Sequence, residues 1–335
     1  MRTVTYNPET FDHDVEQARD WFRGRRNLLI TTHLRPDGDA LGSVFAATDC
    51  LRNEGIDCTP YLAESLPDDY QHYTVPGAVC DEDIDLSPFD GLLCLDCANE
   101  NRLALPPNRS FDDITLPCCN IDHHIDNSRF GHVNVIHAES ASTTELLATM
   151  FGKFGYPVSP AAATSLILGL VMDTGGFRFN NTTAASFRCA ANLVDGGADY
   201  THVMHSMFFN EPMELLRLKG EVFKNLKFAF DGRFVYFSLT PDLLERCGAT
   251  AEMAEDLIDS VRVIRGVEIT CRVQQIDDVT RFSLRSQNPD LPILEIAHKL
   301  GGGGHLLAAG ATQTGITLEE AEAQLVEYVG ELLAR

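Results

Sequence analysis

The stretch Ile30-Thr31-Thr32-His33-Leu34-Arg35-Pro36-Asp37-Gly38-Asp39-Ala40-Leu41-Gly42-Ser43 decides how this chain is organised. An apolar run, Leu28 to Ile30, leads into it and predicts a buried strand that ends at His33. Pro36 and Gly38 then predict an irregular turn, because proline fixes φ and glycine tolerates positive φ. A helical pattern starts after Asp39.

This turn places one imidazole and two carboxylates, those of His33, Asp37 and Asp39, at the carboxyl end of a strand. Open α/β sheets bind their ligands at this end of the strands. Two carboxylates so close together repel each other unless cations bind. The competing interpretation is a solvated turn and a helix N-cap, and the rest of the chain decides between the two.

Composition sets the outer limits. The 335 residues are enough for two domains, each with its own core. With 49 acidic and 26 basic residues the net charge is −23, which argues against a non-specific grip on long nucleic acid. It permits a small phosphorylated substrate held by metals and a few Arg or His side chains. Because we find neither a run of 18 apolar residues nor a signal peptide, we expect a cytoplasmic protein with no membrane association.

The ten cysteines of such a chain are expected to be free thiols. Cys94 and Cys97 form a C-x-x-C, but no second C-x-x-C completes a zinc site. We therefore interpret them, and the pair Cys118-Cys119, as buried small hydrophobic residues.

Three more apolar segments end in acidic or imidazole side chains. They are Gly91 to Leu95 before Asp96, Cys118 to Ile121 before Asp122-His123-His124, and a predicted helix, Ala161 to Met172, before Asp173. An aspartate at the end of a buried strand needs a partner, because an unpaired buried charge is costly. Four carboxylates and two imidazoles would thus meet at one rim: His33, Asp37, Asp39, Asp96, His123 and Asp173. Mixed oxygen and nitrogen ligands favour Mn²⁺, Mg²⁺ or Co²⁺ over a structural zinc, and two such ions about 3.5–4 Å apart serve phosphoester hydrolysis.

The second half predicts a smaller domain that contains several strands. Asp231-Gly232 between two β-rich runs is typical of a hairpin, and another strand pair is expected around Asp277-Asp278. A short helix then runs into four glycines, Gly301 to Gly304, and His305. Backbone N–H groups in such a loop can approach a phosphate closely. The alternatives are a flexible linker and, for the strand residue Arg285, an ordinary exposed charge.

Five strings, in this order and at suitable spacing, resemble the motifs of the DHH phosphoesterase superfamily. They are THLRPDGDALGS, LDC with Asp96, IDHH, MDTGGFRF, and GGGGHLLAAGA preceded by FSLRS. The last string is similar to the DHH-associated C-terminal domain, and the chain most resembles the nano-RNase and pAp-phosphatase (NrnA-type) branch, which is related to RecJ. The resemblance implies an α/β protein: a parallel-sheet DHH domain, a smaller α/β domain with a mixed sheet, and an active site in the cleft between them. We place the domains at 1–195 and 216–335, with a connector at 196–215.

The resemblance also implies roles for single residues. One ion would be held by His33, Asp37 and Asp96, and the other by Asp39, Asp96, His123 and Asp173. Asp122 would orient its neighbours, His124 would contact the scissile phosphate, and an activated hydroxide would attack phosphorus in line. The rest of the substrate would be bound by Arg285, Ser286, Gly303, Gly304 and His305. The ions are expected to be Mn²⁺, with Mg²⁺ or Co²⁺ as alternatives.

The implied reaction is hydrolysis of short oligoribonucleotides, of pAp, or of both, to mononucleotides. The sequence shows no long basic track for a longer strand. Three alternatives stay open: a cyclic or linear dinucleotide phosphodiesterase, a pyrophosphatase-like hydrolase, and a non-catalytic nucleotide sensor. Retention of every expected ligand argues against the sensor, and the glycine-rich C-terminal domain favours a nucleotide over pyrophosphate. A homodimer is compatible with the sequence.

Overall fold

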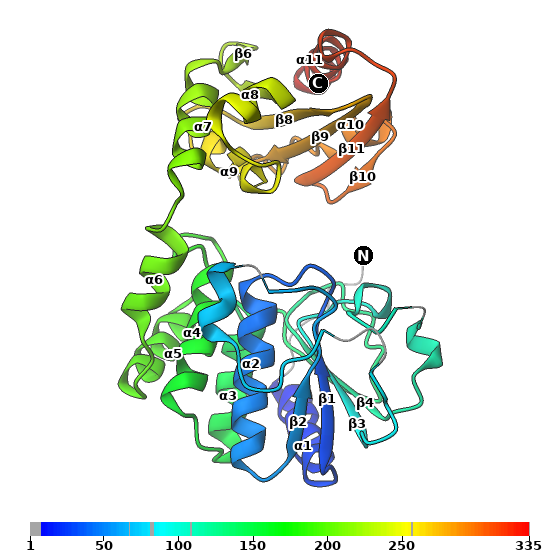
Figure 1. Cartoon of the computed structure of the whole chain (residues 1–335), viewed down its shortest axis with the longest axis vertical. Helices are drawn as coiled ribbons and strands as arrows, with labels where there is room; N and C mark the ends of the chain where they lie inside the picture. The colour runs from blue at the N-terminus through cyan, green and yellow to red at the C-terminus, as the bar shows by residue number, and fades with distance from the viewer. Residues whose placement is uncertain (1–7, 67, 81–83, 108, 256, 335) are drawn as a thin grey trace. The chain divides into compact units, whose positions relative to one another are not determined.

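The computed structural model describes residues 8–66, 68–80, 84–107, 109–255 and 257–334. The chain folds into two compact units, Met1–Asn210 and Glu211–Arg335, each with its own sheet (Figure 1). The division falls inside the segment 196–215, for which the sequence predicts a connector.

The N-terminal unit is built on a parallel five-stranded sheet of order β2-β1-β3-β4-β5. Its strands are β1 Asn27–Thr31, β2 Asp57–Pro60, β3 Gly91–Leu95, β4 Cys118–Asp122 and β5 Val133–Ile136. Every residue of β3 and β4 is buried. Burial on both faces is typical of parallel sheets, and it explains why these strands read as continuous apolar runs.

Six α-helices and three short 3₁₀ helices complete the described part of this unit. They are α1 Pro8–Arg23, α2 Gly38–Asn53, η1 Asp68–Tyr73, η2 Glu100–Arg102, η3 Phe111–Asp113, α3 Thr143–Phe154, α4 Pro160–Asp173, α5 Ala184–Asp195 and α6 Tyr200–Phe208. The side chains of Ser142, Ser159 and Thr183 cap α3, α4 and α5. Helix α6 lies in the predicted connector, where Asp199 caps it and Val203 packs into the core of this unit.

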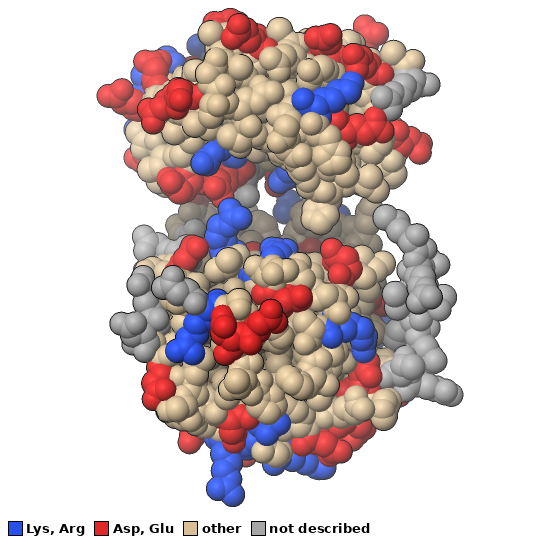
Figure 2. Space-filling view, turned by 90° about the vertical axis from the view of Figure 1, so that its right-hand side faces the viewer, with Lys and Arg blue, Asp and Glu red and all other residues tan. Residues whose placement is uncertain are grey.

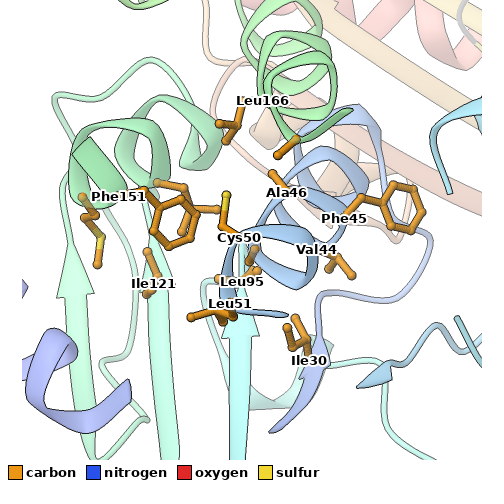
Figure 3. Packing of buried hydrophobic residues seen from close by; sticks show 14 of the residues in the cluster. Ile30, Val44, Phe45, Ala46, Cys50, Leu51, Leu95, Ile121, Phe151 and Leu166 are labelled. Carbon is orange, nitrogen blue, oxygen red and sulfur yellow. The ribbon is translucent and has the colours of Figure 1, made fainter. Parts of the chain in front are cut away.

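The main core lies between one face of this sheet and the helices. Ile30, Leu95 and Ile121 of the strands pack in one cluster with Val44 and Leu51 of α2 (Figure 3). The other face of the sheet is covered mainly by irregular segments between β2 and β5. With both faces packed, the ends of the strands are held in fixed positions.

The C-terminal unit contains a mixed six-stranded sheet of order β10-β11-β9-β8-β7-β6. The pair β7 and β8 is parallel and the other pairs are antiparallel. The strands are β6 Lys227–Ala229, β7 Phe234–Leu239, β8 Ile269–Ile276, β9 Val279–Ser286, β10 Gly303–Gly304 and β11 Ala308–Thr314. Both predicted strand pairs are therefore present. The glycine stretch differs from the predicted loop, because Gly303 and Gly304 pair with Gly310 and Ala309 as a short strand.

Helices cover both faces of this second sheet. They are α7 Met213–Lys224, α8 Pro241–Cys247, η4 Glu252–Ala254 and α9 Leu257–Arg262 on one face, and α10 Leu294–Lys299 and α11 Leu318–Leu333 on the other. All ten cysteines are free thiols, as expected. Among the helices that the structure describes, none is both long enough and apolar enough to cross a membrane.

Candidate active site

The carboxyl ends of three neighbouring strands and the ends of two helices bring the predicted metal ligands together. His33 follows β1, Asp96 follows β3, and His123 follows β4. Asp37 and Asp39 lie at the start of α2, and Asp173 is the last residue of α4. Three overlapping groups have ligand atoms within 4.8 Å of one another: His33, Asp37 and Asp96; Asp39, His123 and Asp173; and Asp96, His123 and His124.

Asp37 is both a helix N-cap and a member of a group of possible metal ligands, the two roles considered for the turn at residues 36–39. Its Oδ1 accepts hydrogen bonds from the backbone N–H groups of Asp39 and Ala40, at 3.0 and 3.1 Å, so it caps α2. The same carboxylate also belongs to the ligand group of His33 and Asp96. The cap fixes the direction in which this carboxylate points.

Asp39 is fully buried and is held by the first residues of α3. Its Oδ2 accepts a hydrogen bond from the Thr143 N–H at 2.7 Å, and its Oδ1 accepts from the N–H and the hydroxyl of Thr144 at 3.0 and 2.7 Å. The amino end of a helix carries positive potential and favours a carboxylate there. The capping sequence that opens α3 thus also positions an expected metal ligand, a role that the sequence analysis missed.

Asp96 occupies the centre of the site. One of its oxygens lies 3.7 Å from Nε2 of His33, and the other lies 3.7 Å from both His123 Nε2 and His124 Nδ1. Its φ of 51° is left-handed, which is rare for a residue other than glycine, and the hydroxyl of Thr143 donates to it at 3.0 Å. A buried carboxylate in a strained backbone conformation is typical of functional sites.

His124 and Asp122 lie beside this centre and are held by hydrogen bonds. Asp122 Oδ1 lies 2.7 Å from His124 Nδ1, and Asn127 donates to Oδ2 at 2.6 Å. Burial by itself would raise the pKa of Asp122, but the hydrogen bonds from His124 and Asn127 outweigh it and hold this pKa below its usual value. Burial would lower the pKa of His124, but the bond to Asp122 raises it instead. Asn127, three residues after His124, was not anticipated.

The buried carboxylates of the site repel one another, and bound cations would relieve this repulsion. Burial and then mutual repulsion among the carboxylates raise the pKa of Asp96 well above its ordinary value and that of Asp173 to about 9. Burial also raises the pKa of Asp39. None of these carboxylates forms an ion pair with a lysine or arginine in the described chain; the basic side chains beside Asp96 and Asp173 are histidines. This donor set, with carboxylate and imidazole atoms converging, fits divalent metal ions.

The predicted substrate residues lie in the C-terminal unit, on or beside one edge of its sheet. Arg285 is on β9, Gly303 and Gly304 form β10, and the His305 N–H donates to the Ala308 carbonyl at 2.8 Å. Ser286 is not brought to the same face as Arg285, because successive strand residues point to opposite faces. It is buried, and its hydroxyl donates to the Asn288 carbonyl at 3.0 Å.

The hydroxyl that does share the face of Arg285 belongs to Ser283, which lies two residues earlier on the same strand. Ser283 was not among the substrate residues that we expected from the sequence. The alternation along FSLRS was the signal that could have found it, because residues two apart in a strand point to the same face.

Comparison with known proteins identifies the family. Residues 27–170 match the model of the DHH family, N-terminal domain. A Thermus thermophilus protein named bifunctional oligoribonuclease and PAP phosphatase NrnA is 32% identical over 313 residues, 92% of this chain and 90% of that protein. This chain belongs to the DHH family, in its NrnA-type branch.

Two further matches support the assignment. The Bacillus subtilis protein of the same name is 27% identical and covers 85% of this chain and 88% of its own length. The crystal structure of an exopolyphosphatase-related protein from Bacteroides fragilis has the same fold, with a TM-score of 0.85, 24% identity and 99% of both chains covered. The DHH family and the α/β fold, with a parallel and a mixed sheet, are therefore confirmed.

Proposed function

We propose that this NrnA-type protein is a metal-dependent phosphoesterase that hydrolyses short oligoribonucleotides and pAp to mononucleotides. The observation that carries the proposal is that the six expected metal ligands, Asp96 among them, lie in overlapping groups at one site. The chain is also related to enzymes named for both activities. It acts in the cytoplasm, in keeping with its free cysteines.

The metals are two divalent ions, Mn²⁺ in the first place, with Mg²⁺ or Co²⁺ as alternatives. His33, Asp37 and Asp96 hold one, and Asp39, Asp96, His123 and Asp173 hold the other. When bound, such ions supply Lewis-acid activation of water and neutralise charge on the phosphate.

His124 contacts the scissile phosphate. Because its Nδ1 is engaged by Asp122, its Nε2 is left for the substrate, and Asp122 is in turn fixed by Asn127. The raised pKa of His124 favours the imidazolium, which donates a hydrogen bond to a phosphate oxygen. Asp122 is a positioning residue, since it acts through His124.

Arg285, Gly303, Gly304 and His305 bind the part of the substrate that does not react. Among the described residues, Arg285 donates only to the carbonyl of its neighbour Leu284, so most of its N–H groups remain available for a phosphate. A β-carbon added at Gly303 would meet no atom within 4 Å, so the backbone there is open to a ligand. No basic track for a long strand is expected in a chain with net charge −23.

A substrate panel tests the proposal. Purified protein is stripped with EDTA, supplied with Mn²⁺, Mg²⁺ or Co²⁺, and given pAp, dinucleotide and pentanucleotide RNA, cyclic di-AMP and pyrophosphate. We expect metal-dependent release of mononucleotides from pAp and from both RNAs. Faster turnover of cyclic di-AMP or of pyrophosphate would replace this substrate assignment, and turnover of no substrate with any metal would refute an enzymatic role.

A further inference from the structure

The sheet of the C-terminal unit has an unusual charge pattern. Its six strands contain no Asp or Glu, although the chain has 49 acidic residues. Acidic side chains are spread widely over the face of the molecule seen in Figure 2. The strands themselves therefore place no carboxylate on either face of this sheet.

All three arginines of these strands lie on one face. The register pairs Arg285 with Thr270, Ser283 with Arg272, and Arg281 with Gln274. Directly paired residues share a face, and so do residues two or four apart in a strand. Arg272 is buried and donates to the carbonyls of Ala254 and Glu255, so it is part of the fold rather than a free cation.

The other two arginines, Arg281 and Arg285, lie on the part of this face that is nearer the β10 edge of the sheet. We call this part of the face the arginine shelf. It is formed by β9, β11 and β10, and its residues are Arg281, Ser283, Arg285, Gly303, Gly310 and Thr312. Gly303, Gly310 and Ser283 form one row across the three strands, so the middle of the shelf has almost no side chains. Arg281 and Thr312, which pair with each other, are exposed.

Arg281 provides a second cationic side chain on the shelf, besides Arg285. It lies four residues from Arg285 along β9, which separates their α-carbons by about 13 Å. Arg281 forms no ion pair with any described carboxylate. Its pair partner Gln274 is only 3% exposed, and the amide nitrogen of Gln274 has no hydrogen-bond acceptor. Because the Gln274 nitrogen is buried, the groups that a ligand can reach are the unpaired guanidinium of Arg281 and the hydroxyl of Thr312, and these suit a phosphate group.

We propose that Arg281, with Thr312, binds a further backbone phosphate of an oligoribonucleotide that has another phosphate bound at Arg285. This inference rests on the proposed function. Both phosphates of pAp are attached to one ribose, so pAp is too short to occupy both positions. Arg281 thereby determines chain-length specificity: it contributes to binding of longer RNA and not to the reaction of pAp.

The test compares Arg281→Gln with the native protein on three substrates: pAp, the dinucleotide ApA, which has a single phosphate, and a pentanucleotide. We expect KM for the pentanucleotide to rise about tenfold with kcat unchanged, as for loss of one charge-assisted hydrogen bond. KM values for pAp and ApA should change by less than about twofold. The slope of log(kcat/KM) against log[salt] should become shallower by about 0.7 for the pentanucleotide only.

Arg217→Gln is the matched control. It removes one positive charge from α7, in the same unit, where Arg217 is exposed and faces Glu214. It should leave all three substrates unaffected, while Arg281→Lys should retain the native salt slope. An equal loss on all three substrates in Arg281→Gln, or an unchanged KM for the pentanucleotide, would overturn the subsite. Failure of the proposed function looks different, because the native protein would then cleave none of the three.

Discussion

Asp96 is the residue on which the site depends most, because its carboxylate belongs to two of the three ligand groups and its two oxygens lie 3.7 Å from nitrogen atoms of three different histidines. Asp96→Asn should lower turnover of pAp and of RNA by more than about 100-fold, since loss of even an outer partner of a metal ligand costs 10–100-fold. Steady-state kinetics with Mn²⁺ on both substrates measures this. Activity near the native level would contradict the assignment of Asp96 to two ions.

Thermal unfolding of the same variant shows whether its loss of activity is due to unfolding. The carboxylate of Asp96 is buried among other carboxylates, so a neutral amide removes repulsion from the metal-free protein. Thermal unfolding in EDTA should therefore give a midpoint for Asp96→Asn at or above that of the native chain. A large decrease would show instead that the loss of activity reflects unfolding.

At the scale of single residues, the sequence predicted which metal ligands would lie together, but it did not predict all the residues that donate hydrogen bonds to them. His33, Asp96 and His123 follow apolar runs directly, and parallel strands bring their carboxyl ends to one edge. Asn127 was missed although it lies only five residues from Asp122. Thr143 was missed because its bonds to Asp39 and Asp96 join segments far apart in the chain. Local patterns contain no information on such long-range contacts.

At the scale of helices, two glycines set how closely α2 and α4 pack. A β-carbon at Gly42 would lie 2.4 Å from the Ser165 carbonyl oxygen, and one at Gly169 would lie 2.5 Å from Asp39 Oδ1. Gly169→Ala should therefore destabilise the fold by about 1–3 kcal/mol, as other overpacked cores do, and weaken metal binding by displacing Asp39. Urea unfolding in EDTA and titration with Mn²⁺ measure the two effects.

Gly152→Ala is the matched control for this prediction. Gly152 lies inside α3, and a β-carbon there would meet no atom within 4 Å. The substitution should stabilise the protein by about 0.5–1 kcal/mol, because glycine is the poorer helix former. If Gly169→Ala were equally harmless, the close contact between α4 and Asp39 would not matter for the site.

The elements themselves were predictable where a signal was strong. Apolar runs identified β1, β3 and β4, and the predicted helix Ala161 to Met172 is present as α4. Helices α6 to α9 and α11 were not anticipated; α8 and α9 span only seven and six residues, too short for a clear helical period. The strand at Gly303–Gly304 was also hidden, because its pairing with β11 is a tertiary contact.

At the scale of the whole molecule, the two units should contribute differently to one reaction. If Arg285 binds a phosphate that does not react, Arg285→Ala should lower kcat/KM for pAp and short RNA by about 10- to 100-fold, the effect of a charge-assisted hydrogen bond. Bis-p-nitrophenyl phosphate has no such second phosphate and should be cleaved nearly as before. Asp39→Ala should abolish both reactions. A uniform loss in Arg285→Ala would place Arg285 at the reacting centre or in folding.

The clustered carboxylates also predict how stability of the whole N-terminal unit depends on pH and metal. The folded-state pKa of Asp173 is about 9 and that of Asp96 is well above the value of 3.8 for an unperturbed aspartate. The folded metal-free protein therefore binds more protons than the unfolded chain between about pH 4 and 9, and its unfolding free energy falls as the pH rises through this window. His137, whose folded pKa is lowered by burial, acts in the opposite direction only below its ordinary pKa of 6.5.

Measurements between pH 7 and 8.5 avoid the opposing effect of His137, while His124, whose pKa is raised, acts there in the same direction as the carboxylates. Urea unfolding in EDTA should give decreasing stability across this range, with a shallower decrease for Asp173→Asn, which removes the group with the pKa of about 9. Mn²⁺ competes with the same protons, so the stabilisation that it adds should be larger at pH 8.5 than at pH 7. Metal-free stability that stayed level or rose with pH would mean that these carboxylates are not forced together in the folded protein. Repulsion among the carboxylates would then not require two cations at this site, whatever the activity of the enzyme.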